Sequence, residues 1–262
     1  CAFDLINAKW IATVEPGEMV IFSKRGIKKI RFSERQRSAM CVFEFIYFAR
    51  PDSVIFGKSV NDVRIELGKQ LAREHPVDAD LVVDVPDSGT PAALGYSEQS
   101  KIPYNRGFVR SHFTGRTFIT PFQTSRELHL RLKLNPIKSV IKNKKIVVVD
   151  DSIVRGNTAK LRVSQLRNAG AKEVHYRIAS PPIKFPCFFG IDFPTKEELI
   201  AANLSIEEIA KEINVDSLNY LSIEGMLKVI GLEKDYCTAC FSGKYKVLPP
   251  RSFNKNIFEE KY

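Results

Sequence analysis

The sequence lacks the features that mark secreted and membrane-spanning proteins. No apolar run approaches the roughly 20 residues that a membrane helix needs, and no basic-then-apolar leader is present. Internal repeats and low-complexity runs are absent as well. A chain of 262 residues with 44% hydrophobic composition is large enough to bury a sizeable core. We therefore expect a globular, cytosolic protein that has no membrane as its partner.

Helices and strands are predicted to alternate from about residue 60 onward. The apolar periodicity predicts helices over 60–74, 91–100, 158–169, 196–202, 206–213 and 222–230, and strands over 79–85, 147–149 and 173–179. This βαβ order predicts a mainly parallel sheet with right-handed crossovers. Residues 1–44 differ, because short apolar runs at 10–14 and 19–22 are broken by turn residues, which is typical of strands joined by turns.

One stretch, residues 146–158 (I-V-V-V-D-D-S-I-V-R-G-N-T), is the most informative part of the chain. Its apolar start predicts a strand buried on both faces of the sheet, and Asp150 and Asp151 follow where that strand ends. Open α/β sheets bind ligands outside the carboxyl ends of their strands. Gly156 permits a positive φ just before a helix, so backbone N–H groups can converge there on a phosphate. The carboxylates would then face hydroxyls or a metal ion, which fits a ribose 5-phosphate with a Mg²⁺-bound pyrophosphate.

Acidic residues are scarce between positions 110 and 145. This segment has nine Lys or Arg and one acid, Glu127, and so holds eight of the ten net positive charges. Such a balance indicates a nucleic acid, an anionic membrane face or a highly charged small substrate. We interpret Lys142, Lys144 and Lys145 as surface lysines and the earlier basic residues as partners of a pyrophosphate.

The stretch 146–158 closely resembles the phosphoribosyl pyrophosphate (PRPP) loop of type I phosphoribosyltransferases, and its form D-D-S-I-V-R-G-x-T resembles the amidophosphoribosyltransferase branch. Five more blocks resemble that family in its order: V-E-P-G-E-M-V-I (14–21), F-I-Y-F-A-R-P-D-S (45–53), V-P-D-S-G (85–89), G-R-T-F-I (115–119) and F-F-G-I-D (188–192). The resemblance implies an α/β, type I phosphoribosyltransferase fold: a twisted, mainly parallel sheet flanked by helices. Asn157, where the family often has Thr, is a small departure whose amide can still meet a phosphate oxygen.

The resemblance also implies a domain organisation and a reaction. Residues 1–44 would be the β-structured end of an N-terminal glutaminase domain with its linker, 45–200 the phosphoribosyltransferase domain, and 201–262 C-terminal helices with a cluster-binding tail. The chain would be the C-terminal portion of an enzyme in which ammonia from glutamine displaces pyrophosphate from PRPP, giving 5-phosphoribosylamine, the first committed step of purine (IMP) synthesis. A homotetramer and purine nucleotide inhibitors are implied as well. Cys1 is followed by Ala-Phe-Asp and matches an internal segment, so we do not expect it to be a glutaminase nucleophile.

The family's binding residues carry over position by position. PRPP binding is implied for Pro86, Asp87, Ser88, Gly89, Asp150, Asp151, Ser152, Ile153, Val154, Arg155, Gly156, Asn157 and Thr158. Ser88, Asp150 and Asp151 would hold Mg²⁺. Residues 111–133 resemble the family's flexible closing loop, in which Arg116 and Lys133 would contact the pyrophosphate. These two and the paired aspartates are the predicted catalytic residues.

Cysteines are few, five in all, and two of them form the pair C-T-A-C at 237–240. In a cytosolic protein this spacing favours a metal or cluster site over disulfides. Cys41, Cys187, Cys237 and Cys240 match the family members that carry a [4Fe-4S] cluster, while a tetrahedral zinc ion or free thiols are the alternatives. Cys1 is left over.

Two other functions fit the PRPP loop. A purine or pyrimidine salvage phosphoribosyltransferase shares the loop but usually lacks the blocks at 14–21 and 45–53 and the four cysteines. A non-catalytic regulator of the same fold would use the net charge of +10 on nucleic acid, but no helix-turn-helix or aromatic-basic platform is evident, so no nucleic-acid partner is expected.

Overall fold

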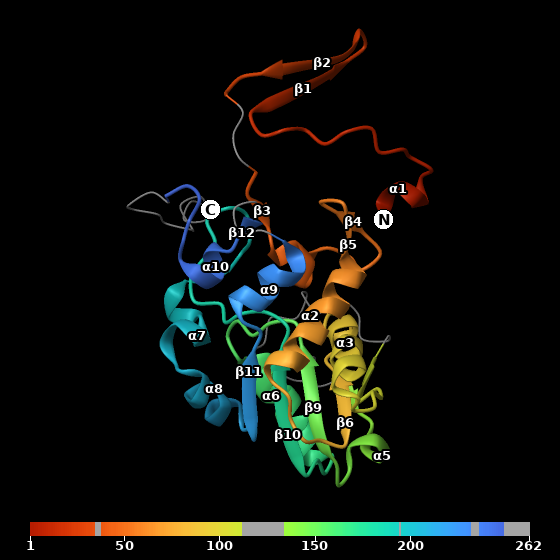
Figure 1. Ribbon diagram of the computed structural model, residues 1–262, viewed down its shortest axis with the longest axis vertical. Helices are drawn as coiled ribbons and strands as arrows, with labels where there is room; N and C mark the ends of the chain where they lie inside the picture. Colours follow the sequence, from red (N-terminus) through yellow and green to blue (C-terminus); the bar gives the residue numbers. More distant parts are fainter. Residues whose placement is uncertain (35–37, 112–133, 194, 232–235, 249–262) are drawn as a thin grey trace, which may run out of the picture.

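The computed structural model describes residues 1–34, 38–111, 134–193, 195–231 and 236–248, and a four-stranded parallel sheet lies at its centre (Figure 1). The strands run in the order β11 (Ser217–Tyr220), β10 (Glu173–Ile178), β9 (Lys145–Asp150) and β6 (Leu81–Asp84). The three strands predicted by the sequence are confirmed as neighbours. The outer strand β11 was not predicted, because its four residues are too few to show a strand pattern in the sequence.

Helices cover both faces of the sheet (Figure 1). One face packs on α2 (Val60–Glu74), α3 (Thr90–Ser100) and α9 (Ile223–Ile230), and the other on α6 (Asn157–Asn168) and α8 (Ile206–Ile213). Strand β9 shows why the chain folds in this way. Val147 and Val149 are buried in the first core and Ile146 and Val148 in the second. Each fully buried side chain of this kind stabilises the fold by about 1.5–3 kcal/mol.

Three of the helices begin at serine caps. Ser59, Ser205 and Ser222 each accept a hydrogen bond from a backbone N–H in the first turn of α2, α8 and α9. The single helix predicted over 196–202 is wrong. It is split into η3 (Lys196–Glu198) and α7 (Ile200–Asn203) because Leu199 is extended, and Ile200 N–H donates to the Val154 carbonyl at 3.0 Å. The break therefore ties α7 to the predicted phosphate loop.

The remaining elements are short and lie outside the four-stranded sheet. They are α1 (Ala2–Leu5), β1 (Glu18–Ser23), β2 (Gly26–Arg31), β3 (Met40–Cys41), η1 (Glu44–Phe48), β4 (Val54–Ile55), β5 (Lys58–Ser59), β7 (Phe108–Arg110), β8 (Leu134–Pro136), α5 (Lys138–Ile141), β12 (Tyr236–Cys237) and α10 (Ala239–Ser242). The predicted strand at 19–22 is part of the β1–β2 hairpin, which stands apart from the sheet in Figure 1. The run at 10–14 forms no strand, since nothing pairs with it in the described ranges. No helix in the part of the chain that the structure describes meets the length and hydropathy that crossing a membrane requires.

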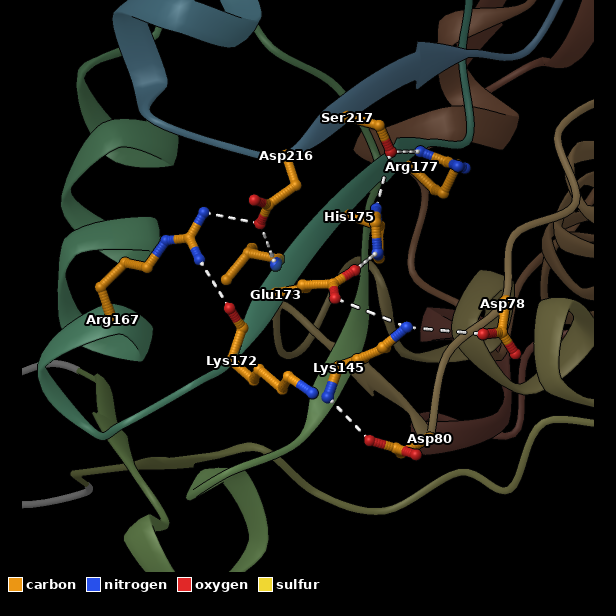
Figure 2. A network of polar contacts seen from close by, with 11 residues as sticks. Asp78, Asp80, Lys145, Arg167, Lys172, Glu173, His175, Arg177, Asp216 and Ser217 are labelled. Carbon is orange, nitrogen blue, oxygen red and sulfur yellow. Dashed lines mark hydrogen bonds and ion pairs between the residues drawn. The ribbon is translucent and has the colours of Figure 1, made fainter.

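A network of polar contacts joins the strands at their amino ends (Figure 2). The Asp216 carboxylate accepts hydrogen bonds from the Val174 N–H and from Arg167 Nη2, both at 2.6 Å. His175 Nδ1 lies 2.9 Å from Ser217 Oγ, so β10 and β11 are joined twice. Lys145 lies 3.5 Å from carboxylate oxygens of both Asp78 and Glu173. Side chains thus join the strands at their amino ends, and the candidate ligand site lies at their carboxyl ends.

Replacing Asp216 with asparagine is expected to lower the free energy of unfolding by about 1 kcal/mol at neutral pH, because two hydrogen bonds lose their charged acceptor. Burial alone would raise the pKa of Asp216, but the Val174 N–H and Arg167 lower it overall from 3.8. A carboxylate with a lowered pKa stabilises the fold above its unfolded pKa, and this contribution is lost as the pH falls. Urea unfolding of both proteins at neutral and acidic pH should therefore show a difference that shrinks toward acid; a difference independent of pH would contradict the assignment.

Candidate active site

The paired aspartates lie where β9 ends, at the carboxyl edge of the sheet. Asp150 is the last residue of β9, and both side chains are 7% exposed. Asp150 Oδ1 accepts the Asp151 N–H at 2.9 Å, and Asp150 Oδ2 accepts the Tyr176 hydroxyl at 2.9 Å. Ser152 Oγ donates to Asp151 Oδ1 at 2.5 Å. The structure therefore fixes both carboxylates before any ligand arrives.

Burial controls the protonation of this pair. It raises the pKa of Asp150 well above its usual range, and the neighbouring Asp151 charge adds to the effect. Burial also raises the pKa of Asp151, although hydrogen bonds from Ser152 and Ser88 and the charge of Arg64 oppose it. Two adjacent carboxylates that are costly to ionise form a site with strong affinity for positive charge. A cation or a developing positive charge would be stabilised beside them.

The predicted phosphate loop connects the aspartates to α6. Gly156 adopts φ 82°, ψ −21° at the start of α6, and no side chain caps that helix. Ile153 anchors the loop in the core with 3% exposure, while Asn157 and Thr158 begin the helix and are exposed. The side chain of Arg155 turns away and its Nε lies 2.6 Å from Glu198 Oε2. What the loop offers to a ligand is therefore mainly backbone N–H groups at a helix N-terminus.

The second predicted loop, residues 86–89, lies against the first. It follows β6, and the Val85 N–H donates to the Val149 carbonyl at 3.0 Å, which fixes it to the end of β9. A Cβ on Gly89 would lie 2.6 Å from that same carbonyl oxygen, so only glycine allows this approach. Ser88 is hydrogen-bonded to Asp151. Two segments about 60 residues apart in sequence thus meet at one site, as the sequence predicted.

The remaining predicted contacts are only partly described. The Arg110 guanidinium forms an ion pair with Asp87, which brings one residue of the basic segment to the edge of the site. Arg116 and Lys133 lie outside the described residues. Their contact with a pyrophosphate remains a prediction.

Four cysteines from distant segments converge above the helices of the first core. β3 pairs in parallel with β12 so that Cys41 and Cys237 are directly opposite. Burial raises the pKa of the Cys41 thiol to about 11, with contributions from Cys237 and Cys187. Burial raises the pKa of Cys240 further, and Cys41, Cys187 and Cys237 all add to it. Cys41 and Cys240 are therefore each within electrostatic reach of both Cys187 and Cys237.

No known protein-family model matches the chain. It is 51% identical over 257 residues to the amidophosphoribosyltransferase of Synechocystis sp. PCC 6803, covering 98% of this chain and 52% of that protein. For the amidophosphoribosyltransferase of Bacillus subtilis 168 the identity is 51% over 250 residues, covering 94% and 52%. The solved B. subtilis glutamine PRPP amidotransferase, complexed with ADP and GMP, superposes with a TM-score of 0.86 at 50% identity, covering 94% of this chain and 55% of that one.

The chain belongs to the amidophosphoribosyltransferase family. It spans about half the length of the curated relatives that it matches. Membership confirms the family predicted from the PRPP loop and the ordered blocks. The parallel sheet with its flanking helices likewise confirms the predicted type I phosphoribosyltransferase fold.

Two buried arginines near the paired aspartates were missed by the sequence analysis. Arg64 is 4% exposed on the apolar side of α2, where it donates to the carbonyls of Phe45 and Ala49 at 2.6 and 2.8 Å. Arg162 is 2% exposed on the apolar side of α6. A signal was available, because each arginine interrupts an apolar stripe at helical spacing, where an unpaired charge would be costly.

Proposed function

We propose that this chain carries out the phosphoribosyl-transfer reaction of the amidophosphoribosyltransferases. In that reaction ammonia displaces pyrophosphate from C1 of PRPP, with Mg²⁺ bound, and gives 5-phosphoribosylamine with inversion. In the whole enzyme glutamine would supply the ammonia through a glutaminase domain. The product would enter purine synthesis as its first committed intermediate.

One observation carries the proposal: the acidic pair, the Ser88 loop and the uncapped start of α6 meet at the carboxyl ends of β6 and β9. These three parts match the three parts of PRPP, which are its 5-phosphate, its ribose and its pyrophosphate. The N–H groups at the start of α6 suit the 5-phosphate, and the carboxylates suit the ribose hydroxyls. The loop 86–89, beside Asp151, suits the pyrophosphate.

The residues of this chain would act by binding, orientation and electrostatics, since the displacement needs no protein nucleophile. Positive charge develops on the ribose ring as the bond to pyrophosphate weakens, and the carboxyl groups of Asp150 and Asp151 would stabilise it. Holding both ends of PRPP fixes C1 where ammonia can attack it. Arg116 and Lys133, in the loop that would close over the site, would neutralise the leaving group and exclude water, which competes with ammonia.

The donor chemistry of Ser88, Asp150 and Asp151 suits Mg²⁺, which prefers carboxylate oxygens together with substrate phosphates. When bound there, Mg²⁺ would neutralise charge on the departing pyrophosphate. Within the described residues, no three His, Cys, Asp or Glu side chains are grouped so that they could hold a metal ion by themselves. A Mg²⁺ ion at this position would take its remaining ligands from the phosphates of the substrate.

The reaction is tested by measuring pyrophosphate release from PRPP and Mg²⁺ under anaerobic conditions. Ammonium chloride, glutamine and a panel of nucleobases are supplied in separate reactions. Release with ammonium ion and none with nucleobases supports the proposal, whereas release that requires a nucleobase would assign a salvage phosphoribosyltransferase. A folded protein that releases no pyrophosphate with any of these acceptors would favour the non-catalytic regulator, to be checked by salt-dependent DNA retention.

The four converging cysteines support a second part of the proposal, a [4Fe-4S] cluster held by Cys41, Cys187, Cys237 and Cys240. The cluster would be surrounded by thiolates from β3, β12, α10 and the loop that contains Cys187. The partial or full burial of these cysteines would protect the cluster from solvent. A cluster core is larger than one ion, so its thiolates lie farther apart than the ligands of a zinc site. The cluster would join the C-terminal tail to the segment before η1.

Replacing Cys240 with serine is expected to abolish the bound iron and sulfide of protein purified without oxygen, because a buried ligand is lost. Cys1→Ser is the matched control, since Cys1 caps α1, outside the group of four, and should leave the iron content unchanged. Metal analysis and visible absorption measure the iron content and the cluster in both variants. Zinc in place of iron, or equal iron in the two variants, would contradict the cluster.

Regulation and assembly are proposed from the relatives. The solved B. subtilis protein binds ADP and GMP, and we propose that this chain also responds to purine nucleotides. A cytosolic homotetramer is proposed from the family resemblance. Analytical sedimentation measures the oligomeric state, and a comparison with and without GMP tests whether the chain responds to a purine nucleotide.

A further inference from the structure

The carboxylate of Asp150 accepts a hydrogen bond from a buried side chain that the proposed reaction does not use. Tyr176, on the neighbouring strand β10, is fully buried, and its hydroxyl donates to Asp150 Oδ2 at 2.9 Å. The other oxygen, Oδ1, accepts the Asp151 N–H at 2.9 Å. Each oxygen therefore has one protein donor, and these two bonds define the plane of the carboxylate.

Behind this pair lies the buried guanidinium of Arg162. Its Nη1 donates to Gln165 Oε1 at 2.8 Å, and Gln165 Nε2 donates to the Leu134 carbonyl at 2.9 Å, so the arginine is itself held in place. Its charge acts on both Tyr176 and Asp150. A buried guanidinium is costly without polar partners, and the hydrogen bond to Gln165 provides one of them here. A polar assembly of this kind inside an apolar core indicates a role beyond packing.

We propose that Tyr176 is a positioning residue for Asp150: its hydroxyl fixes the orientation in which the Asp150 carboxylate meets the ribose of PRPP. The inference rests on the proposed function, because it assigns Asp150 to the ribose. The hydroxyl leaves the second lone pair of each carboxylate oxygen free for a ligand. Without it the carboxylate would lose one of its two fixed points and could rotate away from the substrate.

The neighbouring strand offers a matched control. Tyr220 lies on the same face of the sheet, on β11, and is 5% exposed. Its hydroxyl has no hydrogen-bond partner among the residues that the structure describes. Tyrosine-to-phenylalanine changes at the two positions remove the same atom from similar surroundings, but only one of them removes a bond to Asp150.

The experiment compares Tyr176→Phe and Tyr220→Phe in steady-state pyrophosphate release, with PRPP varied at saturating ammonium ion. A hydrogen bond to a charged group corresponds to a factor of roughly ten or more, so kcat/KM for PRPP should fall about tenfold in Tyr176→Phe. It should change by less than about twofold in Tyr220→Phe. Urea unfolding of both variants verifies that each is folded under assay conditions.

A double-mutant cycle separates positioning from a general effect on the fold. Adding Tyr176→Phe to Asp150→Asn should cause no further loss, because the carboxylate that it orients is already gone. An additive loss, equal effects at positions 176 and 220, or failure of Tyr176→Phe to fold would each overturn the positioning role. A wild-type chain without ammonia-dependent release would instead overturn the proposed function, and the positioning role with it.

Discussion

Replacing Asp151 with asparagine is expected to reduce ammonia-dependent pyrophosphate release by on the order of 10²–10³-fold, the size of effect seen when one preorganised electrostatic contact to a transition state is removed. Asparagine has nearly the same shape, so the change isolates the charge. Asp151 receives hydrogen bonds from Ser88 and Ser152 and lies near Arg64, and this environment is arranged for a carboxylate. The neutral amide cannot stabilise the positive ribose or the metal ion.

The same substitution is expected to leave the free energy of unfolding unchanged or higher at neutral pH. Burial raises the pKa of Asp151, which means that its ionised form costs the folded state free energy, and a neutral side chain removes that cost. Activity and stability should therefore move in opposite directions, as is typical of residues selected for function. Asp216→Asn makes the same chemical change at the opposite edge of the sheet, and its activity should remain near that of the wild type. Equal activity losses in the two variants would show that the effect of Asp151→Asn is not specific to the site.

The parts of the fold that depend on local sequence were predicted well. α2 and α8 begin and end where the apolar periodicity and the serine caps place them. The site was predictable for a related reason: a β-branched run that ends in two carboxylates and a glycine turn constrains its own geometry. That the loop 86–89 would lie beside it followed from both loops leaving parallel strands at the same edge.

The parts that depend on contacts distant in sequence were not predictable. β11 is too short to show a period, and it is a strand because Asp216 and Ser217 join it to β10. The break at Leu199 follows from the backbone bond between Ile200 and Val154. Tyr176 looked like one more apolar residue of a strand, and nothing local indicates that its hydroxyl would reach Asp150. Long-range polar bonds of this kind require the tertiary structure.

The crossing of α2 and α3 gives the prediction with the largest effect on stability. A Cβ on Gly68 would lie 1.9 Å from the carbonyl oxygen of Ala92, and a Cβ on Gly95 would lie 1.9 Å from that of Ile65. The two helices thus touch backbone to backbone at two points. Each glycine is needed because even a methyl group has no room, and a backbone carbonyl cannot rotate away as a side chain can.

Gly68→Ala is expected to lower the free energy of unfolding by roughly 3 kcal/mol, the upper part of the usual range for overpacking. Helix propensity alone would predict the opposite, a gain of about 1 kcal/mol in the free energy of unfolding. The sign of the measured change therefore shows whether overpacking or helix propensity dominates at Gly68. The matched comparison is Gly225→Ala in α9, where the nearest atom is Oε1 at the end of the Glu74 side chain. Moving that carboxylate breaks its hydrogen bonds with Gln70 and Ser222 but shifts no backbone, so the loss should be smaller. Urea unfolding measures both variants, and a stabilised Gly68→Ala would rule out the close crossing.

Because α3 begins directly after Ser88 and Gly89, any separation of the helices would also move the pyrophosphate loop. We therefore expect Gly68→Ala to release pyrophosphate more slowly than Gly225→Ala even at temperatures where both remain folded.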